Sequence, residues 1–217
     1  MISVSAQSVR YSKVKLNLYL FRHGKTAFNE SGLLSGTSDD PLTEEGVYQL
    51  KKMVEKFQCP SADALFSSPL SRCIQTAAIL YPKFAPIIVP DLREISFGQL
   101  EHTPIQDLQS SNLGRQLLSN DFAVRFPGGE SKQDCLDRAI HSMDTIFSEA
   151  CKQGWTRVAV SSHTCFIQIL LSSVEDKASK AVAVVPNGMG YHILLDSDVW
   201  FRNRTFTLVD KIPREAW

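Results

Sequence analysis

The sequence predicts an α/β fold, a three-layer α/β/α sandwich around a mostly parallel sheet, with a small helical cap inserted in it. Apolar runs of strand length alternate along the chain with stretches of helical periodicity, the pattern of a parallel sheet covered by helices. The chain has 217 residues, of which 43% are hydrophobic, and this suits a globular unit with a sizeable core. Because no repeat, low-complexity tract or linker divides it, we expect a single domain over residues 1–217.

The candidate strands are short apolar runs bounded by polar residues, prolines or turns. In chain order they are Leu16–Phe21, Ala64–Ser67, Ile87–Val89, Val158–Val160, Val182–Val185, Tyr191–Leu195, Trp200–Phe201 and Thr205–Val209. The first alternates and then becomes continuous, as expected of a strand that enters the centre of a sheet. The last two form a candidate edge near Trp200–Val209, where pairing between two copies would give a homodimer.

The helices are predicted from apolar residues at helical spacing and from residues that favour helix starts. One begins after Thr43, the expected N-cap, because two acids follow in its first turn. A second covers Leu70–Leu80, and Pro69 suits its first turn. The longest helical pattern runs over Ser131–Gln153, and a shorter one follows at Phe166–Leu171.

Residues 99–127 differ from the rest of the chain. They contain no strong strand signal and several short amphipathic pieces, so we interpret them as an inserted cap that sets specificity. The polar side chains His102, Arg115 and Arg125 are its candidate substrate contacts. Taken singly, each of the three is equally well explained as a solvated surface group.

The charge balance and the cysteines bear on partners and compartment. The chain carries 23 Lys and Arg against 23 Asp and Glu side chains, whereas a nucleic-acid or anionic-membrane partner would favour a basic excess, so neither partner is expected. Five cysteines without a Cys-x-x-Cys pair fit neither a disulfide framework nor a zinc ribbon, and scattered free thiols are typical of a reducing compartment. No apolar stretch approaches the roughly 18–20 residues of a membrane helix. We therefore expect a cytoplasmic protein.

A polar cluster follows three of the predicted strands, at the point where a helix begins. The clusters are Arg22-His23-Gly24, Ser67–Arg72 and Ser161–His163. In a parallel α/β sheet such positions lie at the carboxyl ends of the strands, where ligands bind, so two histidines and two arginines are expected in one pocket. Two guanidinium groups predict an anionic ligand, and phosphate is the commonest partner of their planar fork. A histidine beside that phosphate is either a binding cation or a nucleophile.

Each of these residues taken alone also has a structural interpretation, Arg72 as a surface helix residue and His163 as a capping or packed histidine. The sequence has no Gly-x4-Gly-Lys-Ser/Thr loop, and no cysteine is followed by an arginine six positions on. Metal ligation by His23 and His163 lacks a third His, Asp or Glu at a telling spacing, so no metal site is expected. The spacing thus predicts a phosphate site and leaves its mechanism open.

The three clusters belong to a longer series of six sequence blocks. They are Arg22–Asn29, Gly36–Gly46, Ser67–Ala77, Leu92–Gly98, Pro127–Ser131 and Ser162-His163. The first block resembles the signature RHG-x-T-x-(W/F)-N, and the second resembles G-x-x-D-x-P-L-T-x-x-G. In order and content the series is similar to the histidine phosphatase superfamily, branch 1, the phosphoglycerate-mutase-like proteins. The resemblance runs from about Leu16 to His192, which is most of the chain.

The resemblance implies a catalytic role for each of five side chains. His23 is the nucleophile and becomes transiently phosphorylated on a ring nitrogen. Glu94 is the general acid for the leaving oxygen and then the base for the attacking water. Arg22, Arg72 and a protonated His163 hold the phosphoryl oxygens, so that these cations face Glu94 as the one acid of the pocket. The chemistry implied in this way needs no metal ion or other cofactor.

Four further residues are expected to bind substrate: Asn29 through a hydrogen bond, and Gly36, Thr164 and His102. Thr164 departs from the family pattern, which usually has a glycine after the second histidine. A β-branched residue resists positive φ, so this turn must use an ordinary backbone region, while its N–H can still donate to phosphate. We interpret the adjacent Cys165 as a packed thiol.

The segment Glu94–Glu101 bears on the reaction. Phosphoglycerate mutases usually have E-R-H-Y-G there and longer insertions, whereas this short chain reads Glu94-Ile-Ser-Phe-Gly98 and resembles the phosphatase branch. The pattern L-x-E-x-x-F-G-x-x-E and the later Asn187-Gly188 are most similar to alpha-ribazole phosphatases, although broad-specificity phosphatases and fructose-2,6-bisphosphatases share much of it. We therefore expect a phosphomonoester hydrolase, with alpha-ribazole 5'-phosphate as a candidate substrate. Mutase-type phosphoryl transfer and a non-catalytic phosphate-binding protein are the alternatives.

Overall fold

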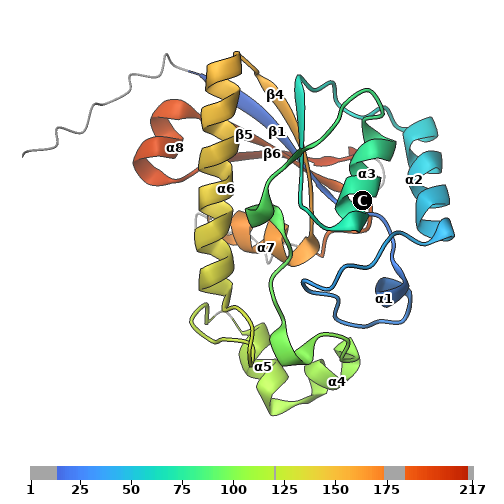
Figure 1. Ribbon diagram of the computed structural model, residues 1–217. Coiled ribbons are helices and arrows are strands. Elements are labelled where there is room, and N and C mark those ends of the chain that lie inside the picture. Colours follow the sequence, from blue (N-terminus) through green and yellow to red (C-terminus); the bar gives the residue numbers. More distant parts are fainter. Residues whose placement is uncertain (1–13, 120, 174–183, 215–217) are drawn as a thin grey trace, which may run out of the picture.

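The computed structural model describes residues 14–119, 121–173 and 184–214 and shows a six-stranded sheet between two layers of helices (Figure 1). The strands are β1 (Lys15–Arg22), β2 (Ala64–Ser67), β3 (Ile87–Ile88), β4 (Arg157–Ser162), β5 (Gly190–Asp196) and β6 (Thr207–Ile212). The helices are α1 (Ala27–Glu30), α2 (Glu44–Lys56), α3 (Ser71–Leu80), α4 (Ile105–Ser110), α5 (Asn112–Leu118), α6 (Lys132–Gln153), α7 (Thr164–Ser172) and α8 (Ser197–Asn203), with two 3-10 turns, η1 (Pro90–Leu92) and η2 (Gly98–Leu100). The predicted α/β sandwich is confirmed.

Parallel strands form the centre of the sheet, whose order is β3-β2-β4-β1-β5-β6. The first four strands in this order are parallel, β5 is antiparallel to β1, and β6 is antiparallel to β5. Strand β1 lies in the middle because it is apolar on both faces. Leu16, Leu18 and Leu20 enter one core cluster, and Tyr19 and Phe21 enter the other. The prediction of a central first strand is therefore confirmed.

Helices α2 and α3 cover one face of the sheet, and α6, α7 and α8 cover the other (Figure 1). Thr43 begins α2 as predicted, because its hydroxyl oxygen accepts the Gly46 N–H at 3.0 Å. Ser131 and Asp134 form a reciprocal capping box at the start of α6. Gly154 ends that helix in the left-handed conformation with φ +70°, which glycine adopts without strain. Within the described ranges, no helix has the length and apolar character needed to cross a membrane.

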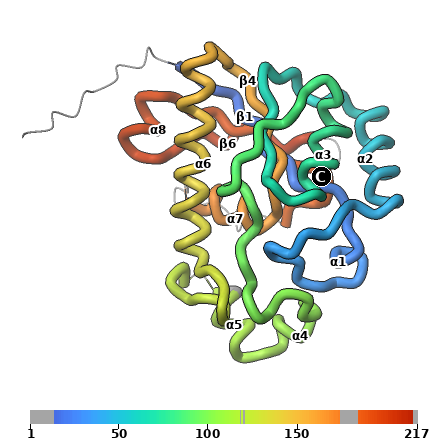
Figure 2. Tube along the Cα trace, viewed as in Figure 1, coloured from blue at the N-terminus to red at the C-terminus, as the bar shows by residue number. Residues whose placement is uncertain are grey.

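The segment predicted as a cap forms short helices. After η2 the chain makes α4 and α5, below the sheet in the view of Figure 1 and on the same side as α1, and then returns to α6 (Figure 2). Leu108, Leu117 and Phe126 attach the segment to the larger core cluster. Its role as a lid over the site stays a prediction.

Three local predictions are corrected. Trp200–Phe201 lies in α8 and not in a strand, because Asp196 caps a helix there and Trp200 is fully buried with its indole N–H on Asp144. Of the expected strand Val182–Val185, residues 182 and 183 lie outside the described ranges, and the other two are not in a strand. Pro69 precedes α3, whose N-cap is Leu70, so the proline stands before the first turn.

Candidate active site

Neighbouring parallel strands end side by side and bring the predicted site together. The register pairs Arg22 at the end of β1 with Ser162 at the end of β4. The next residues, His23 and His163, therefore meet at the carboxyl edge of the sheet, and Ser68 joins them from the end of adjacent β2. The imidazole centroids of the two histidines are 5.2 Å apart.

His23 is held with one ring nitrogen free of a proton. The side chain is 3% exposed, and Nδ1 lies 2.7 Å from the Gly24 carbonyl oxygen. Because a carbonyl oxygen only accepts, Nδ1 carries the proton and Nε2 keeps its lone pair. Gly24 is fixed in turn, since its N–H donates to Thr76 Oγ1 at 2.8 Å and its carbonyl also accepts from Asn187 Nδ2 at 3.1 Å. This is the tautomer that a nucleophilic imidazole requires.

His163 is fully buried. Its Nε2 lies 2.8 Å from Ser68 Oγ and 3.3 Å from Cys73 Sγ. Burial first, and then the charge of Arg72, lower the pKa of His163 well below the usual 6.5. Burial and Arg72 thus disfavour the protonated form of this ring, and a protonated His163 beside a bound phosphate stays a prediction. Burial raises the pKa of the Cys73 thiol to about 12, so this thiol stays protonated.

Arg72 is fully buried, and its guanidinium is held by the loop that follows α1. Nη1 donates to the Ser38 carbonyl and to Asp40 Oδ1, and Nη2 donates to the Gly36 carbonyl, each at 2.7 Å. Three of the five N–H groups of the guanidinium are thereby engaged. The Nε–H remains unpaired in the described part of the chain.

Asp40 is a buried acid that the sequence analysis did not single out. It is 7% exposed, pairs with Arg72, and also accepts from Ser35 Oγ at 2.8 Å. The prediction that Glu94 is the one acid facing the cations of the pocket is therefore wrong. The neighbouring Asp39 is exposed and instead accepts from the N–H and hydroxyl of Ser71, at the start of α3.

Unpaired polar atoms gather at this site. Among the described residues, the buried side-chain nitrogen and oxygen atoms without a hydrogen-bond partner are Arg22 Nε, Arg72 Nε, Asp40 Oδ2 and Thr164 Oγ1. Arg22 is anchored through Nη1 on the Val185 carbonyl at 2.6 Å, which leaves Nε to another acceptor. A buried unpaired donor costs on the order of 1–3 kcal/mol, and such groups in a native structure call for an explanation. A bound anion would satisfy both Nε–H groups.

Glu94 lies across the N-terminus of α7. Its Oε1 accepts the N–H groups of Ile95 at 3.0 Å and Phe166 at 2.9 Å, and its Oε2 accepts the Cys165 N–H at 3.1 Å. The side chain is 5% exposed and close enough to Arg22 to oppose the lowering of that residue's pKa by burial. The carboxyl group is thus fixed beside the predicted phosphate site.

The turn after His163 follows an ordinary backbone path, as predicted for a β-branched residue. His163 is extended, and Thr164 begins α7 in helical conformation. Burial, and then Glu94, raise the pKa of Cys165 well above its usual value, in agreement with a packed thiol. The Thr164 hydroxyl oxygen is one of the unpaired atoms, so this side chain can also reach a ligand.

The other predicted binding residues have different surroundings. Asn29 Oδ1 accepts from Asn187 Nδ2 at 3.1 Å, and Gly36 meets Arg72 through its carbonyl. His102 is exposed, stacks on Phe28 at 4.5 Å, and lies 3.0 Å from Ser38 Oγ through Nε2. Direct contact of these residues with a substrate stays a prediction.

Two cap arginines are occupied elsewhere. Arg125 pairs with Asp134 at 2.6 Å and donates to the Gly129 carbonyl, while Arg115 donates to the Ser110 carbonyl of its own segment. Both are exposed. The structure does not bring them to the histidines, and the interpretation as surface groups fits both.

His23 and His163 have no third side chain beside them, among the described residues, that would complete a metal site. Within the described ranges, no group of three or more His, Cys, Asp or Glu side chains is placed to hold a metal ion. The two histidines have other partners, Gly24 for His23 and Ser68 for His163.

Comparison with known proteins agrees with this geometry. Residues 18–198 match the sequence profile of the histidine phosphatase superfamily (branch 1). The chain belongs to this superfamily. Over 163 residues it is 34% identical to the probable phosphoglycerate mutase GpmB of Salmonella choleraesuis strain SC-B67, which covers 73% of this chain and 74% of that protein.

Solved structures of this histidine phosphatase fold are similar over nearly the whole chain. A phosphoglycerate mutase from Bacillus anthracis str. Sterne has a TM-score of 0.76 at 22% identity and covers 91% of this chain and 92% of that one. A candidate alpha-ribazole-5'-P phosphatase from Escherichia coli K-12 has a TM-score of 0.69 at 24% identity, with 89% and 94% covered. At these identities the likeness shows the fold, and it supports the resemblance drawn from the six sequence blocks.

Acidification is expected to destabilise this member of the superfamily below about pH 6.5. Burial lowers the pKa values of His23 and His163 in the folded protein, so below pH 6.5 the unfolded chain binds more protons at these two histidines than the folded chain does. Their contribution to stability is fully present above the pKa of an unfolded histidine and is lost as the pH falls, by up to about 1.4 kcal/mol per pH unit for each histidine. Urea unfolding at pH 7.5, 6.5 and 5.5 measures how steeply the free energy of unfolding changes with pH. This dependence should be weaker in a His163→Asn variant, and an unchanged dependence would contradict a lowered pKa of His163 in the folded protein.

Proposed function

We propose that this protein hydrolyses small phosphomonoesters through a phosphohistidine intermediate on His23. The observation that carries the proposal is the pair of buried, unpaired Nε–H groups of Arg22 and Arg72, both close enough to lower the pKa of the His23 ring. Phosphate oxygens satisfy such donors through charge-assisted hydrogen bonds. The free lone pair on Nε2 of His23 lies in the same site, so that binding and attack can occur together.

The first step forms the phosphoenzyme. The Nε2 lone pair attacks phosphorus while the ester P–O bond breaks, and the leaving oxygen takes a proton from the Glu94 carboxylic acid. The arginines stabilise the charge on the equatorial oxygens in the transition state. The Gly24 carbonyl holds Nδ1–H and supports the positive charge that develops on the ring.

The second step regenerates the enzyme. The Glu94 carboxylate takes a proton from a water molecule, whose oxygen attacks phosphorus as the P–N bond breaks. Inorganic phosphate leaves, and His23 returns to the neutral tautomer with Nε2 free. Each cycle thus consumes one ester and one water and yields one alcohol and one phosphate.

Two candidate activities, hydrolysis and mutase-type phosphoryl transfer, differ in their substrate and in the group that accepts the phosphoryl group. The segment Glu94-Ile-Ser-Phe-Gly98, in place of the mutase pattern E-R-H-Y-G, favours hydrolysis, with alpha-ribazole 5'-phosphate as one candidate substrate. The 34% identity to a probable phosphoglycerate mutase favours the alternative, phosphoryl transfer to a second hydroxyl. Both activities share the first step and differ in whether water or a sugar-acid hydroxyl accepts the phosphoryl group.

A substrate panel distinguishes these activities. With EDTA present, we expect the purified protein to release phosphate from p-nitrophenyl phosphate and from some members of a panel of alpha-ribazole phosphate, phosphoserine, fructose bisphosphates and nucleotides. EDTA should not matter, because fixed arginines supply the positive charge. Interconversion of 3- and 2-phosphoglycerate faster than any phosphate release would establish the mutase. Vanadate binding without turnover of any substrate would indicate a non-catalytic binder.

A further inference from the structure

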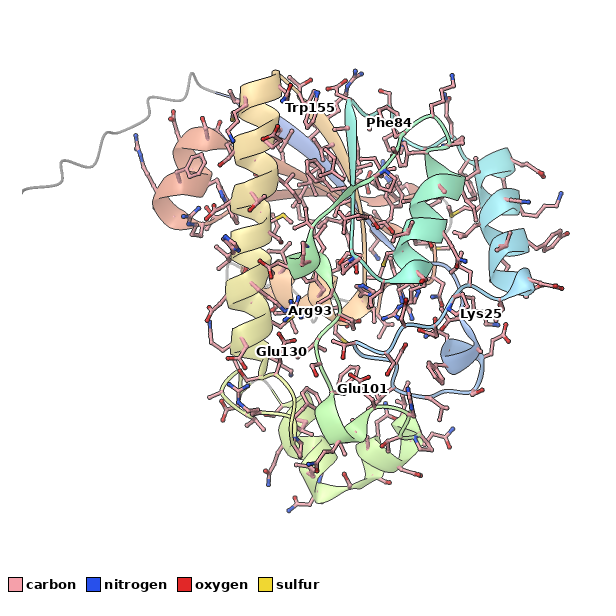
Figure 3. The ribbon with its side chains drawn as sticks, in the orientation of Figure 1. Lys25, Phe84, Arg93, Glu101, Glu130 and Trp155 are labelled. Carbon is pink, nitrogen blue, oxygen red and sulfur yellow. The ribbon has the colours of Figure 1, made fainter. Side chains whose placement is uncertain are left out.

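Glu101 connects the base of the cap to the loop that holds Arg72. It directly follows η2, and Figure 3 shows it between the segment of α4 and α5 and the loop that follows α1. Its Oε1 accepts the Thr37 N–H at 2.9 Å and the Thr37 hydroxyl at 2.8 Å. Its Oε2 accepts the Ser38 N–H at 3.0 Å and the Ser38 hydroxyl. One carboxylate thus binds two consecutive residues through four hydrogen bonds.

The same stretch of backbone orients the Arg72 guanidinium. The peptide group between Gly36 and Thr37 presents its carbonyl to Arg72 Nη2 at 2.7 Å and its N–H to Glu101. Because a peptide group is planar, a shift at its N–H end rotates the carbonyl at the other end. Ser38 connects Glu101 to Arg72 in a second way. The N–H and the hydroxyl of Ser38 donate to Glu101, and the Ser38 carbonyl accepts from Arg72 Nη1.

Glycine at position 36 allows this close arrangement. A Cβ atom there would lie 2.5 Å from Glu101 Oε1, well inside van der Waals contact. The residue also has φ +55°, in the left-handed region that favours glycine. The carboxylate is therefore packed directly against the backbone that carries the Arg72 acceptor.

The cap and this loop are also joined along the backbone. The His102 N–H donates to the Leu34 carbonyl at 2.7 Å, and the Leu34 N–H donates to the Thr103 carbonyl at 3.0 Å. A displacement of the cap base would therefore be carried into the residues that precede Gly36. Glu101 is the charged contact within this junction.

We propose that Glu101 is a positioning residue for phosphate binding, which fixes the Gly36 and Ser38 carbonyls so that the free Nε–H of Arg72 is aimed at the anion. This inference rests on the proposed function, because it assigns phosphate to Arg72. Glu101 acts through the loop backbone and through Arg72. It couples the segment predicted to set specificity to the group that binds the phosphoryl oxygens.

The first test is the affinity for inorganic phosphate. In Glu101→Gln an amide NH₂ replaces one acceptor oxygen and faces donors of Thr37 or Ser38, so the loop must shift. We expect its Kd for phosphate, measured by calorimetry, to rise about tenfold, and kcat/KM for p-nitrophenyl phosphate to fall by a similar factor. Thr37→Ala removes only one of the four hydrogen bonds and should weaken binding in the same direction by about threefold, which provides a second measurement if Glu101→Gln does not fold.

Asp63→Asn is the matched control. Asp63 also holds two consecutive residues: it accepts the N–H groups of Thr156 and Arg157 at 3.0 Å each, and it accepts from the side chains of both. It directly precedes β2 and holds the start of β4, at the opposite end of these parallel strands from the histidines. A comparable loss of thermal stability with unchanged phosphate affinity is expected for this variant. Equal weakening of phosphate binding in the two variants would overturn the proposal, because general destabilisation would explain both.

A double-mutant cycle tests whether the effect passes through Arg72. In the Arg72→Ala background, Glu101→Gln should change kcat/KM by less than about twofold, since the group it positions is gone. A full tenfold loss in that background would overturn the proposal. If the wild-type protein neither binds phosphate nor hydrolyses an ester, the proposed function fails and this inference fails with it. Phosphate binding by the wild type with no weakening in Glu101→Gln overturns the inference alone.

Discussion

Replacing His23 by alanine is expected to lower kcat/KM for p-nitrophenyl phosphate by at least about 10³-fold. The reason lies in the tautomer: Nδ1–H is bound to the Gly24 carbonyl, and Nε2 offers the lone pair that forms the P–N bond. Burial, and then the charges of Arg22 and Arg72, lower the pKa of the side chain well below its usual value, which favours the unprotonated ring at neutral pH. Without the ring, no covalent intermediate can form, and water must attack phosphorus without covalent catalysis.

Rapid-quench labelling tests this expectation directly. The wild-type protein, mixed with a ³²P-labelled phosphomonoester and quenched within one turnover, should carry label that is stable to base and labile to acid, as a phosphoramidate is. His23→Ala should carry none. His192→Gln is the matched control, because His192 lies on β5, partly buried, with its Nε2 on Asn17 Oδ1 and no contact with the site. Acid-stable label in the wild type, or equal turnover in wild type and His23→Ala, would refute the nucleophile assignment.

The position of the site could be predicted because it follows from sheet topology. Arg22-His23 and Ser162-His163 each end an apolar run, and parallel strands bring such ends to one edge. The helix starts at Thr43 and Ser131 were equally accessible, since each depends on a few neighbouring residues. These are short-range signals, which a single sequence contains in full.

Long-range contacts were not accessible in the same way. Asp39 and Asp40 are adjacent acids in the sequence, yet Asp40 turns inward to Arg72 and Asp39 outward to Ser71. Only the folded path of the loop distinguishes them. Glu101 is the last residue of the pattern L-x-E-x-x-F-G-x-x-E, but its contacts depend on the approach of residues 36–38, more than 60 positions away in the chain.

The strand predicted at Trp200–Phe201 shows where local patterns fail. Trp200-Phe201 is an apolar pair, and periodicity over two residues cannot distinguish a strand from a helix. A helix forms because Asp196 caps its N-terminus and the Trp200 indole N–H donates to Asp144. The charge of His163 is also beyond the reach of local patterns, because a pKa depends on burial and on every neighbouring cation, which a sequence does not display.

Glu94→Gln is expected to slow turnover of an alkyl phosphate such as phosphoserine by about 10²–10⁴-fold, the usual contribution of general acid–base catalysis. The carboxyl group is fixed in place by the N–H groups of Ile95, Cys165 and Phe166. A glutamine keeps the size of the side chain and has no proton to give to the leaving alkoxide, while its NH₂ group faces one of the N–H donors that the carboxylate accepts. Thermal unfolding of the variant measures the structural cost of that lost acceptor, and comparison of two substrates separates it from the chemical loss.

Two substrates on the same Glu94→Gln variant supply the internal control. p-Nitrophenolate leaves without a proton, so formation of the phosphoenzyme from p-nitrophenyl phosphate should be nearly as fast as in the wild type. Hydrolysis of that phosphoenzyme still needs Glu94 as a base, and stopped-flow absorbance should therefore show a burst of about one p-nitrophenolate per active site, followed by slow turnover. Equal losses for both substrates without a burst would mean that Glu94 holds the fold of the site and transfers no proton. A burst with p-nitrophenyl phosphate and none with phosphoserine would place the proton of the first step and the base of the second on the same carboxyl group.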